Sequence, residues 1–134
     1  SLSVDVLALP LVTLQSAITN TVNPTNEIDL VWTPAATPTV GNYQVMIVRK
    51  AGGAPSAPTQ GAPYVVNDSC GGGTVVYKGF DSSFTDTGLT AGTEYHYAFC
   101  SENYNYYASA SAANETTAGS GAPFVPSGTV FRFQ

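Results

Sequence analysis

Charged side chains are scarce in this sequence. Only 10% of its 134 residues are charged, and the net charge is -5. The four cations, Arg49, Lys50, Lys78 and Arg132, leave no basic patch of the kind that neutralises nucleic-acid phosphates. We therefore expect no nucleic-acid partner.

Long hydrophobic runs are also missing. No apolar stretch approaches the ~18 to 20 residues needed to cross a bilayer, and the longest one near the start is broken by Pro10. Residues 1–9 lack the basic region and methionine of a signal peptide. Because Gly, Pro, Ser, Thr and Asn build most of the polar surface, we expect an extracellular or cell-surface protein, exported with a signal sequence since removed, and no membrane span.

Helical periodicity is absent, whereas alternation of apolar and polar residues recurs between turn residues. The pattern predicts an all-β, seven-stranded antiparallel sandwich of the immunoglobulin-like class. The expected principal strands are 11–19, 27–34, 42–50, 74–79, 84–89, 93–100 and 107–117, with a short edge strand at 63–66.

Two of these segments show which side is buried. In 27–34 the residues Ile28 and Trp32 share one face, and in 42–50 Val45 points inward. Met46 and Val48 then face outward, which indicates that this second side of the sheet is also covered. Residues 51–73 are too rich in Gly and Pro for a central strand and form a long loop.

Trp32, Tyr43 and above all "GLTAGTEYHYAF" resemble a fibronectin type III domain, in the form found in secreted, cell-surface proteins of Bacteroidetes-like bacteria. The resemblance implies a structural core of Trp32, Tyr43, Leu89 and Tyr95, with the last two forming a tyrosine corner. It spans about residues 10–118. The loop 51–73, between strands C and C′, is longer than the family's usual turn, and the family fold itself has no active site.

Segments outside the resemblance define the domain organisation. Residues 1–9 are an N-terminal apolar strand extension, and 119–134 are a linker followed by a C-terminal strand segment. Any function particular to this protein is expected in these segments and in the insertion 51–73.

The two cysteines allow one disulfide, and two buried free thiols are the alternative. In the implied topology strand C lies between C′ and F, so an insertion folded across strand C would bring Cys70 to Cys100. We predict this bridge, which should stabilise the fold by roughly 3 to 4 kcal/mol.

Catalytic and metal-binding patterns are absent. His96 is the only histidine, and no nucleophile elbow accompanies it. One histidine and two cysteines are too few for zinc, and the spacing of Asp68, Asp81 and Asp86 matches no calcium loop. We predict a protein that is not an enzyme and has no cofactor.

The loop "SENYNYYA" between strands F and G carries Tyr104, Tyr106 and Tyr107. Clustered tyrosines offer rigid contact area for a sugar or protein. The alternative is that Tyr107 packs on the sandwich and the others cover the insertion.

The sequence is compatible with three functions. The first is a structural subunit of an extracellular filament, pilus or surface layer, which assembles with copies of itself through strand addition by its terminal segments. The second is an adhesion or carbohydrate-binding module that recognises a host or surface glycan or protein. The third is an accessory domain of a secreted hydrolase. We favour the first, with subunit contacts made by Leu2, Val4, Val6, Leu7, Leu9, Met46, Val48, Val130, Phe131 and Phe133.

Overall fold

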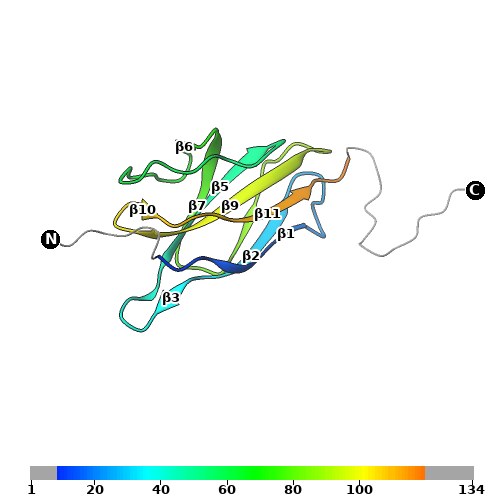
Figure 1. Ribbon diagram of the computed structural model, residues 1–134. Helices are drawn as coiled ribbons and strands as arrows, with labels where there is room; N and C mark the ends of the chain where they lie inside the picture. The colour runs from blue at the N-terminus through cyan, green and yellow to red at the C-terminus, as the bar shows by residue number, and fades with distance from the viewer. Residues whose placement is uncertain (1–8, 120–134) are drawn as a thin grey trace, which may run out of the picture.

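The computed structural model describes residues 9–119. Figure 1 shows two layers of antiparallel strands, and no helix occurs in the described range. Four of the eleven strands have only two residues. The strands are β1 (Thr13–Thr19), β2 (Ile28–Thr33), β3 (Ala36–Thr37), β4 (Gly41–Asn42), β5 (Gln44–Ala51), β6 (Ser69–Cys70), β7 (Gly73–Gly79), β8 (Ser83–Asp86), β9 (Glu94–Asn103), β10 (Tyr106–Tyr107) and β11 (Ser111–Thr116).

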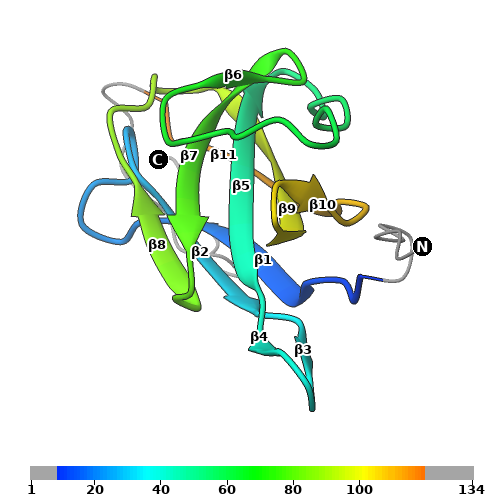
Figure 2. The same ribbon diagram turned by 90° about the vertical axis from the view of Figure 1, so that its left-hand side faces the viewer.

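One layer is a three-stranded sheet in the order β1-β2-β8. The other is a six-stranded sheet in the order β10-β9-β5-β7-β6, with β11 also paired to β9. The small hairpin of β3 and β4 projects from one end of the sandwich (Figure 2). The prediction of an all-β antiparallel fold is confirmed. The two-residue strands were not predicted, because two residues are too few to show alternation of apolar and polar side chains.

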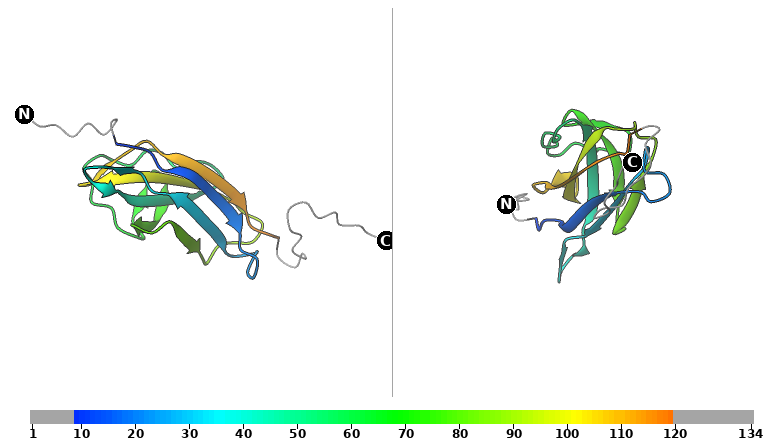
Figure 3. Two further views of the ribbon diagram at one scale, coloured as in Figure 1. Left: turned by 90° about the horizontal axis from the view of Figure 1, so that it is seen from below. Right: turned by 90° about the vertical axis from the view of Figure 1, so that its right-hand side faces the viewer.

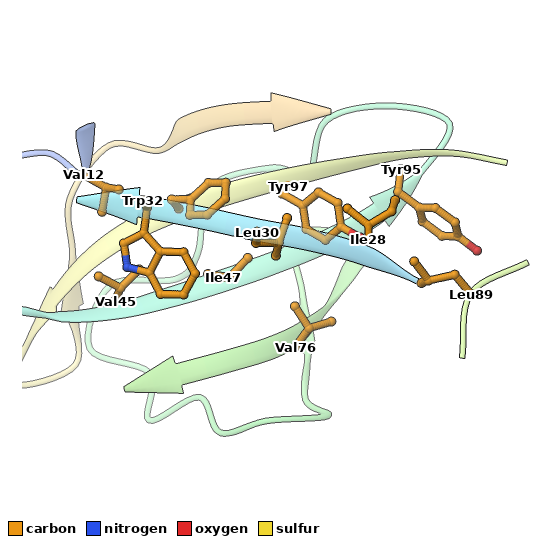
Figure 4. Close-up of a cluster of buried hydrophobic side chains, with 11 residues drawn as sticks. Val12, Ile28, Leu30, Trp32, Val45, Ile47, Val76, Leu89, Tyr95 and Tyr97 are labelled. Atoms are coloured by element: carbon orange, nitrogen blue, oxygen red, sulfur yellow. The ribbon is translucent and has the colours of Figure 1, made fainter. Parts of the chain in front are cut away.

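The inner core lies between the two sheets (Figure 4). Ile28, Leu30 and Trp32 of β2 point inward, as their alternation predicts, and meet Val45 and Ile47 of β5. Trp32 packs against Phe99 and Tyr77, with ring centroids 5.7 and 5.3 Å apart. The inner apolar faces of both sheets are thereby removed from water.

A tyrosine corner closes the connection into β9. The Tyr95 hydroxyl accepts a hydrogen bond from the Thr90 backbone N–H at 2.8 Å, and both Leu89 and Tyr95 are buried. A buried phenol satisfies its polar atom in this way while its ring remains in the core. Leu89 and Tyr95 thus have the burial and the hydrogen bond of a tyrosine corner.

The insertion between β5 and β6 covers the outer face of the six-stranded sheet. We call residues 52–68 the strap. The strap passes over β5 in Figure 2, and a second apolar cluster lies in this layer, formed by Met46, Val48, Cys70, Val75, Ala98, Cys100 and Tyr107 with Tyr64 of the strap against it. The second covered face inferred from Met46 and Val48 is confirmed.

One local prediction is wrong, and one predicted strand carries an irregularity that was not predicted. Residues 63–66 form no strand, and the pairing with β7 is made instead by Ser69 and Cys70. In β1 a bulge between Thr13 and Ser16 interrupts the expected alternation, and Leu14 takes a positive φ of 52°. An extra residue in one strand turns the following side chains to the other face.

Candidate binding surfaces

Met46 and Val48 are not available to another subunit. Both are almost completely buried, at 0% and 1% exposed, because the chain's own strap covers them. Their assignment to a subunit contact is therefore corrected. The alternation correctly predicts that both side chains point outward, but it does not show which segment of the chain covers that face.

The strap is held down by polar bonds to β10. The Gln60 amide donates to the Tyr107 carbonyl and accepts from the Tyr107 N–H, both at 2.8 Å. The Tyr107 hydroxyl donates to the Ala62 carbonyl, and the Tyr64 ring meets the Tyr107 ring edge-on at 5.6 Å. Gln60 thus occupies both backbone groups that Tyr107 would offer to a further strand.

A close backbone contact fixes the other end of the strap. Ser56 N–H donates to the Gly71 carbonyl at 2.8 Å, and Gly71 has a positive φ of 59°. A Cβ atom at Gly71 would lie 2.0 Å from the Ser56 carbonyl oxygen. Only glycine fits both the conformation and the space.

The predicted disulfide is not formed. Cys70 and Cys100 are both buried free thiols in the apolar cluster beneath the strap. Burial raises the pKa of Cys100 to about 12, with a smaller contribution from Cys70, and burial also raises the pKa of Cys70. These thiols stay protonated at neutral pH and are weak nucleophiles.

A small cavity of about 190 Å³ remains between the strap and the sheet. Its walls are mainly apolar, with Val48, Ala98 and Cys100 from the sheet and Pro55 and Pro58 from the strap. A dry apolar cavity of this size can accept a benzene-sized group. It holds no cluster of acid, base or nucleophile that would suggest catalysis.

The three loop tyrosines do not share one surface. Tyr104 is 83% exposed, whereas Tyr107 is 1% exposed and packs beneath the strap. Tyr104 and Asn105 both have positive φ and form the tight turn between β9 and β10. The part of the alternative in which Tyr107 packs on the sandwich is observed, whereas Tyr104 is exposed and does not cover the insertion. Tyr106 is partly buried, so the three rings form no common platform.

The strand edges of β1 and β11 close each other. The two strands lie side by side in Figure 3. The Gln15 amide donates to the Ala112 carbonyl, the Ser111 hydroxyl donates to the Val12 carbonyl, and the Glu115 carboxylate accepts from the Thr19 N–H. These contacts occupy backbone groups on both edges.

The outer edge of β8 is open. In the described chain β8 has β2 as its one strand partner. Trp32 N–H donates to the Ser82 carbonyl, so alternation turns the backbone groups of Ser83 and Thr85 away from β2. A cavity of about 320 Å³ lies beside this edge, with Val66, Val76 and Phe84 among its lining residues.

The outer face of the three-stranded sheet is bare and partly apolar. Leu14, Ile18 and Val31 are 82%, 58% and 49% exposed. Asp29 lies on the same face, opposite Ile18, and its carboxylate accepts from the Asn20 amide and the Thr85 hydroxyl. No part of the described chain covers these side chains as the strap covers the other sheet.

A buried polar cluster, which no sequence pattern predicts, joins the two sheets. Arg49 Nη1 lies 2.9 Å from Asp86 Oδ1, and the Tyr97 hydroxyl donates to Asp86 Oδ2 at 2.7 Å. Burial and the Asp86 charge raise the pKa of Tyr97. Asp86 has 3% exposure and is fully engaged, so the cluster is a structural bridge.

Chemistry at the remaining candidates is limited. His96 is partly exposed and contacts Glu94 at 2.8 Å. Among the described residues no three His, Cys, Asp or Glu side chains gather to hold a metal ion, and no helix is long and apolar enough to span a membrane.

Several predicted contact residues lie outside residues 9–119: Leu2, Val4, Val6, Leu7, Val130, Phe131 and Phe133. Leu9 lies inside this range and is buried with Ala35, Tyr43 and Ala108. Leu9 therefore packs with the sandwich rather than standing free for another subunit.

Comparison with known proteins shows similarity of fold. No family model and no curated protein matches the sequence. The structure is similar to the third fibronectin III domain of the human KIAA0343 protein, with a TM-score of 0.57 and 14% identity over 94% of this chain and 97% of that one. It is also similar to a fibronectin type III domain of the human KIAA0970 protein, with a TM-score of 0.55 and 16% identity over 96% and 87%.

The titin kinase with its flanking domains is a further similar structure, with a TM-score of 0.51 and 14% identity. That match covers 80% of this chain, which spans 17% of the titin chain. At these identities the comparisons establish the fold alone. The described chain has a fibronectin type III-like fold, which is consistent with a structural or binding module.

Proposed function

We propose that this chain is a non-enzymatic structural subunit of an extracellular filament, pilus or surface layer. Residues 2–7 of one copy add as a strand to the outer edge of β8 in the next copy. The observation that carries the proposal is the open edge of β8, which has a strand partner on one side only. An unpaired row of backbone groups is a template for an incoming strand.

The other edges are less suitable receivers. The edges of β1 and β11 are occupied by side-chain bonds to each other, and Gln60 occupies the edge of β10. The first half of β7 is bonded by Asn67 and Asp68. The open edge of β8 thus offers an incoming strand the best access in the described chain.

The donor segment fits that edge in length and chemistry. Leu2, Val4 and Val6 alternate with polar residues, so one side of an extended segment is apolar. Beside β8 that side would face the cavity of about 320 Å³ that Val76 and Phe84 help to line. The low charge of the chain reduces repulsion between copies.

The test uses the full chain and a proline at the receiving edge. Ser83→Pro removes an N–H that points away from β2, and Ser83→Ala is the matched control that keeps it. We expect polymers of the wild type and Ser83→Ala in electron microscopy and light scattering, and monomers of Ser83→Pro. Polymers of Ser83→Pro equal to those of the control, or a wild type that stays monomeric at high concentration, would contradict the proposal.

A second experiment controls for misfolding of the proline variant. A chain that lacks residues 1–8 keeps the buried Leu9 and should remain monomeric. A synthetic peptide of residues 1–8 should bind this truncated chain with Ser83→Ala and fail to bind it with Ser83→Pro. Thermal unfolding of both truncated variants checks that they are folded, and equal peptide binding would overturn the assignment to β8.

A further inference from the structure

Leu14 is held in a conformation that does not suit leucine. Its φ of 52° lies in the left-handed region, where Gly and Asn are favoured, and the bulge in β1 turns its side chain outward. The side chain is 82% exposed. An exposed side chain adds little to the stability of the described sandwich and does not offset this backbone strain. The strain therefore points to a contact outside the sandwich.

The surroundings of Leu14 form a continuous surface on the three-stranded sheet. Ile18 lies further along β1, and Val31 of β2 is opposite Ser16, so these side chains share the outer face. Asp29 lies on the same face, opposite Ile18. An exposed apolar strip of this kind fits an apolar partner segment.

The chain leaves the described range at the end of this face. The Ala118 N–H donates to the Pro24 carbonyl, and the Gly92 N–H donates to the Ala118 carbonyl. Pro24 lies in the loop that joins β1 to β2, next to the end where Ile18 and Asp29 stand opposite each other. The described chain therefore ends close to the β1–β2 loop, at one end of the three-stranded sheet.

The sequence of that segment matches the face in its apolar character. Residues 129–133 read "TVFRF", in which Phe131 and Phe133 share one side of an extended strand. Arg132 is the one charged residue of 120–134. Residues 120–128 can span about 30 Å when extended, more than the roughly 17 Å of β1 between Thr19 and Leu14.

We propose that residues 129–133 dock on the outer face of the three-stranded sheet of the same chain. Phe131 and Phe133 cover Leu14, Ile18 and Val31, and Arg132 lies on the opposite side of the extended segment and points away from the sheet. The inference goes beyond the proposed assembly, because it uses the opposite end of the chain and a sheet face rather than an edge. It moves Val130, Phe131 and Phe133 from a contact between subunits to a contact within one.

Trypsin provides the test because it cleaves after Arg132. The measured quantity is the rate of loss of Phe133 and Gln134 from the full chain, followed by mass spectrometry, against the rate for a synthetic peptide of residues 127–134. We expect the chain to be cleaved about tenfold more slowly, since burying one or two large apolar side chains shifts the docking equilibrium by that factor. Cleavage at the peptide's rate would overturn the proposal.

Leu14→Asn is the decisive variant. Asparagine accepts the positive φ, so the sandwich should stay folded while the apolar contact is lost. Tyr104→Asn is the matched control, since Tyr104 is equally exposed, also has a positive φ, and lies in the β9–β10 turn, away from this sheet face. We expect Leu14→Asn to be cleaved at close to the peptide's rate and Tyr104→Asn at the wild-type rate. Ile18→Ser is a second variant of the same sheet face, and the same result is expected for it as for Leu14→Asn.

Dilution separates docking in the same chain from docking on another copy. Protection within one chain does not depend on protein concentration, whereas protection by another copy decreases on dilution. Protection that disappears on dilution would contradict the proposal. The dilution experiment uses the Ser83→Pro monomer. Its result can therefore be interpreted even if strand addition at β8 does not occur.

Discussion

The two sheets of this sandwich differ on their outer faces. The six-stranded sheet carries Met46 and Val48 there, and the strap buries both. The three-stranded sheet carries Ile18 and Val31 at equivalent outward positions, and both are about half exposed or more. The same kind of residue is thus part of a core in one sheet and part of the surface in the other.

This difference indicates where binding can occur. On the six-stranded side the chain has already used its insertion to cover apolar surface and the β10 edge, so few contacts remain to be made. On the three-stranded side the outer face and the β8 edge are both uncovered in the described chain. Exposed apolar residues beside an open edge are the usual marks of an interaction surface.

The largest effect is expected where the two sheets are joined. Asp86→Ala removes the partner of Arg49 and Tyr97, and leaves a buried hydroxyl and a half-buried guanidinium without it. We expect a loss of about 3 kcal/mol in the free energy of unfolding, measured with urea. Asp29→Ala is the control on the bare face and should cost about 1 kcal/mol or less. Equal costs would refute the role given to Asp86.

A slightly smaller effect is expected at the strap. Gly71→Ala meets both a positive φ and the Ser56 carbonyl, and should cost about 2 kcal/mol or more. Gly53→Ala is the matched control in the same insertion, because a Cβ there meets nothing within 4 Å. Urea unfolding of the two variants checks the difference, and a neutral Gly71→Ala would mean that the strap is not held as described.

The tyrosine corner should contribute about 1 kcal/mol. Tyr95→Phe keeps the buried ring and leaves the Thr90 N–H without the hydroxyl that accepts its bond. Tyr104→Phe, at an exposed hydroxyl, should change the unfolding free energy by a few tenths of a kcal/mol at most. A Tyr95→Phe protein as stable as the Tyr104→Phe protein would contradict the account.

Ionisation of the buried thiols should not affect stability near neutral pH and should lower it increasingly in alkali. Burial in the folded state raises the pKa of Cys100 from its ordinary value of 9.0 to about 12. The unfolded chain therefore loses this proton first, and stability falls as pH rises from about 9 to 12. Cys100→Ala should show a shallower decline in urea midpoint over that range. An identical decline in both proteins would show that the thiol is not buried as described.

Much of the fold could be predicted because strand alternation reports burial. Ile28, Leu30 and Trp32 alternate with polar residues and are core residues, and the Leu89 to Tyr95 stretch identified the corner. The strap has no hydrophobic periodicity, so its path over β5 could not be predicted from its Gly and Pro content. The bulge at Leu14 was equally hidden, since nothing in a run of alternating residues marks an inserted one. Asp86 pairs with Arg49 across 37 residues, a contact that one sequence does not reveal.

The same substitution on the two outer faces tests the central contrast most directly. Val48→Ala on the strap side and Val31→Ala on the bare side remove identical atoms from 1% and 49% exposed side chains. In the monomeric Ser83→Pro background, we expect Val48→Ala to lower the free energy of unfolding by about 2 kcal/mol and Val31→Ala by about 0.5 kcal/mol or less. Equal losses, or a larger loss at Val31, would contradict the conclusion that one sheet is covered on both faces and the other on one.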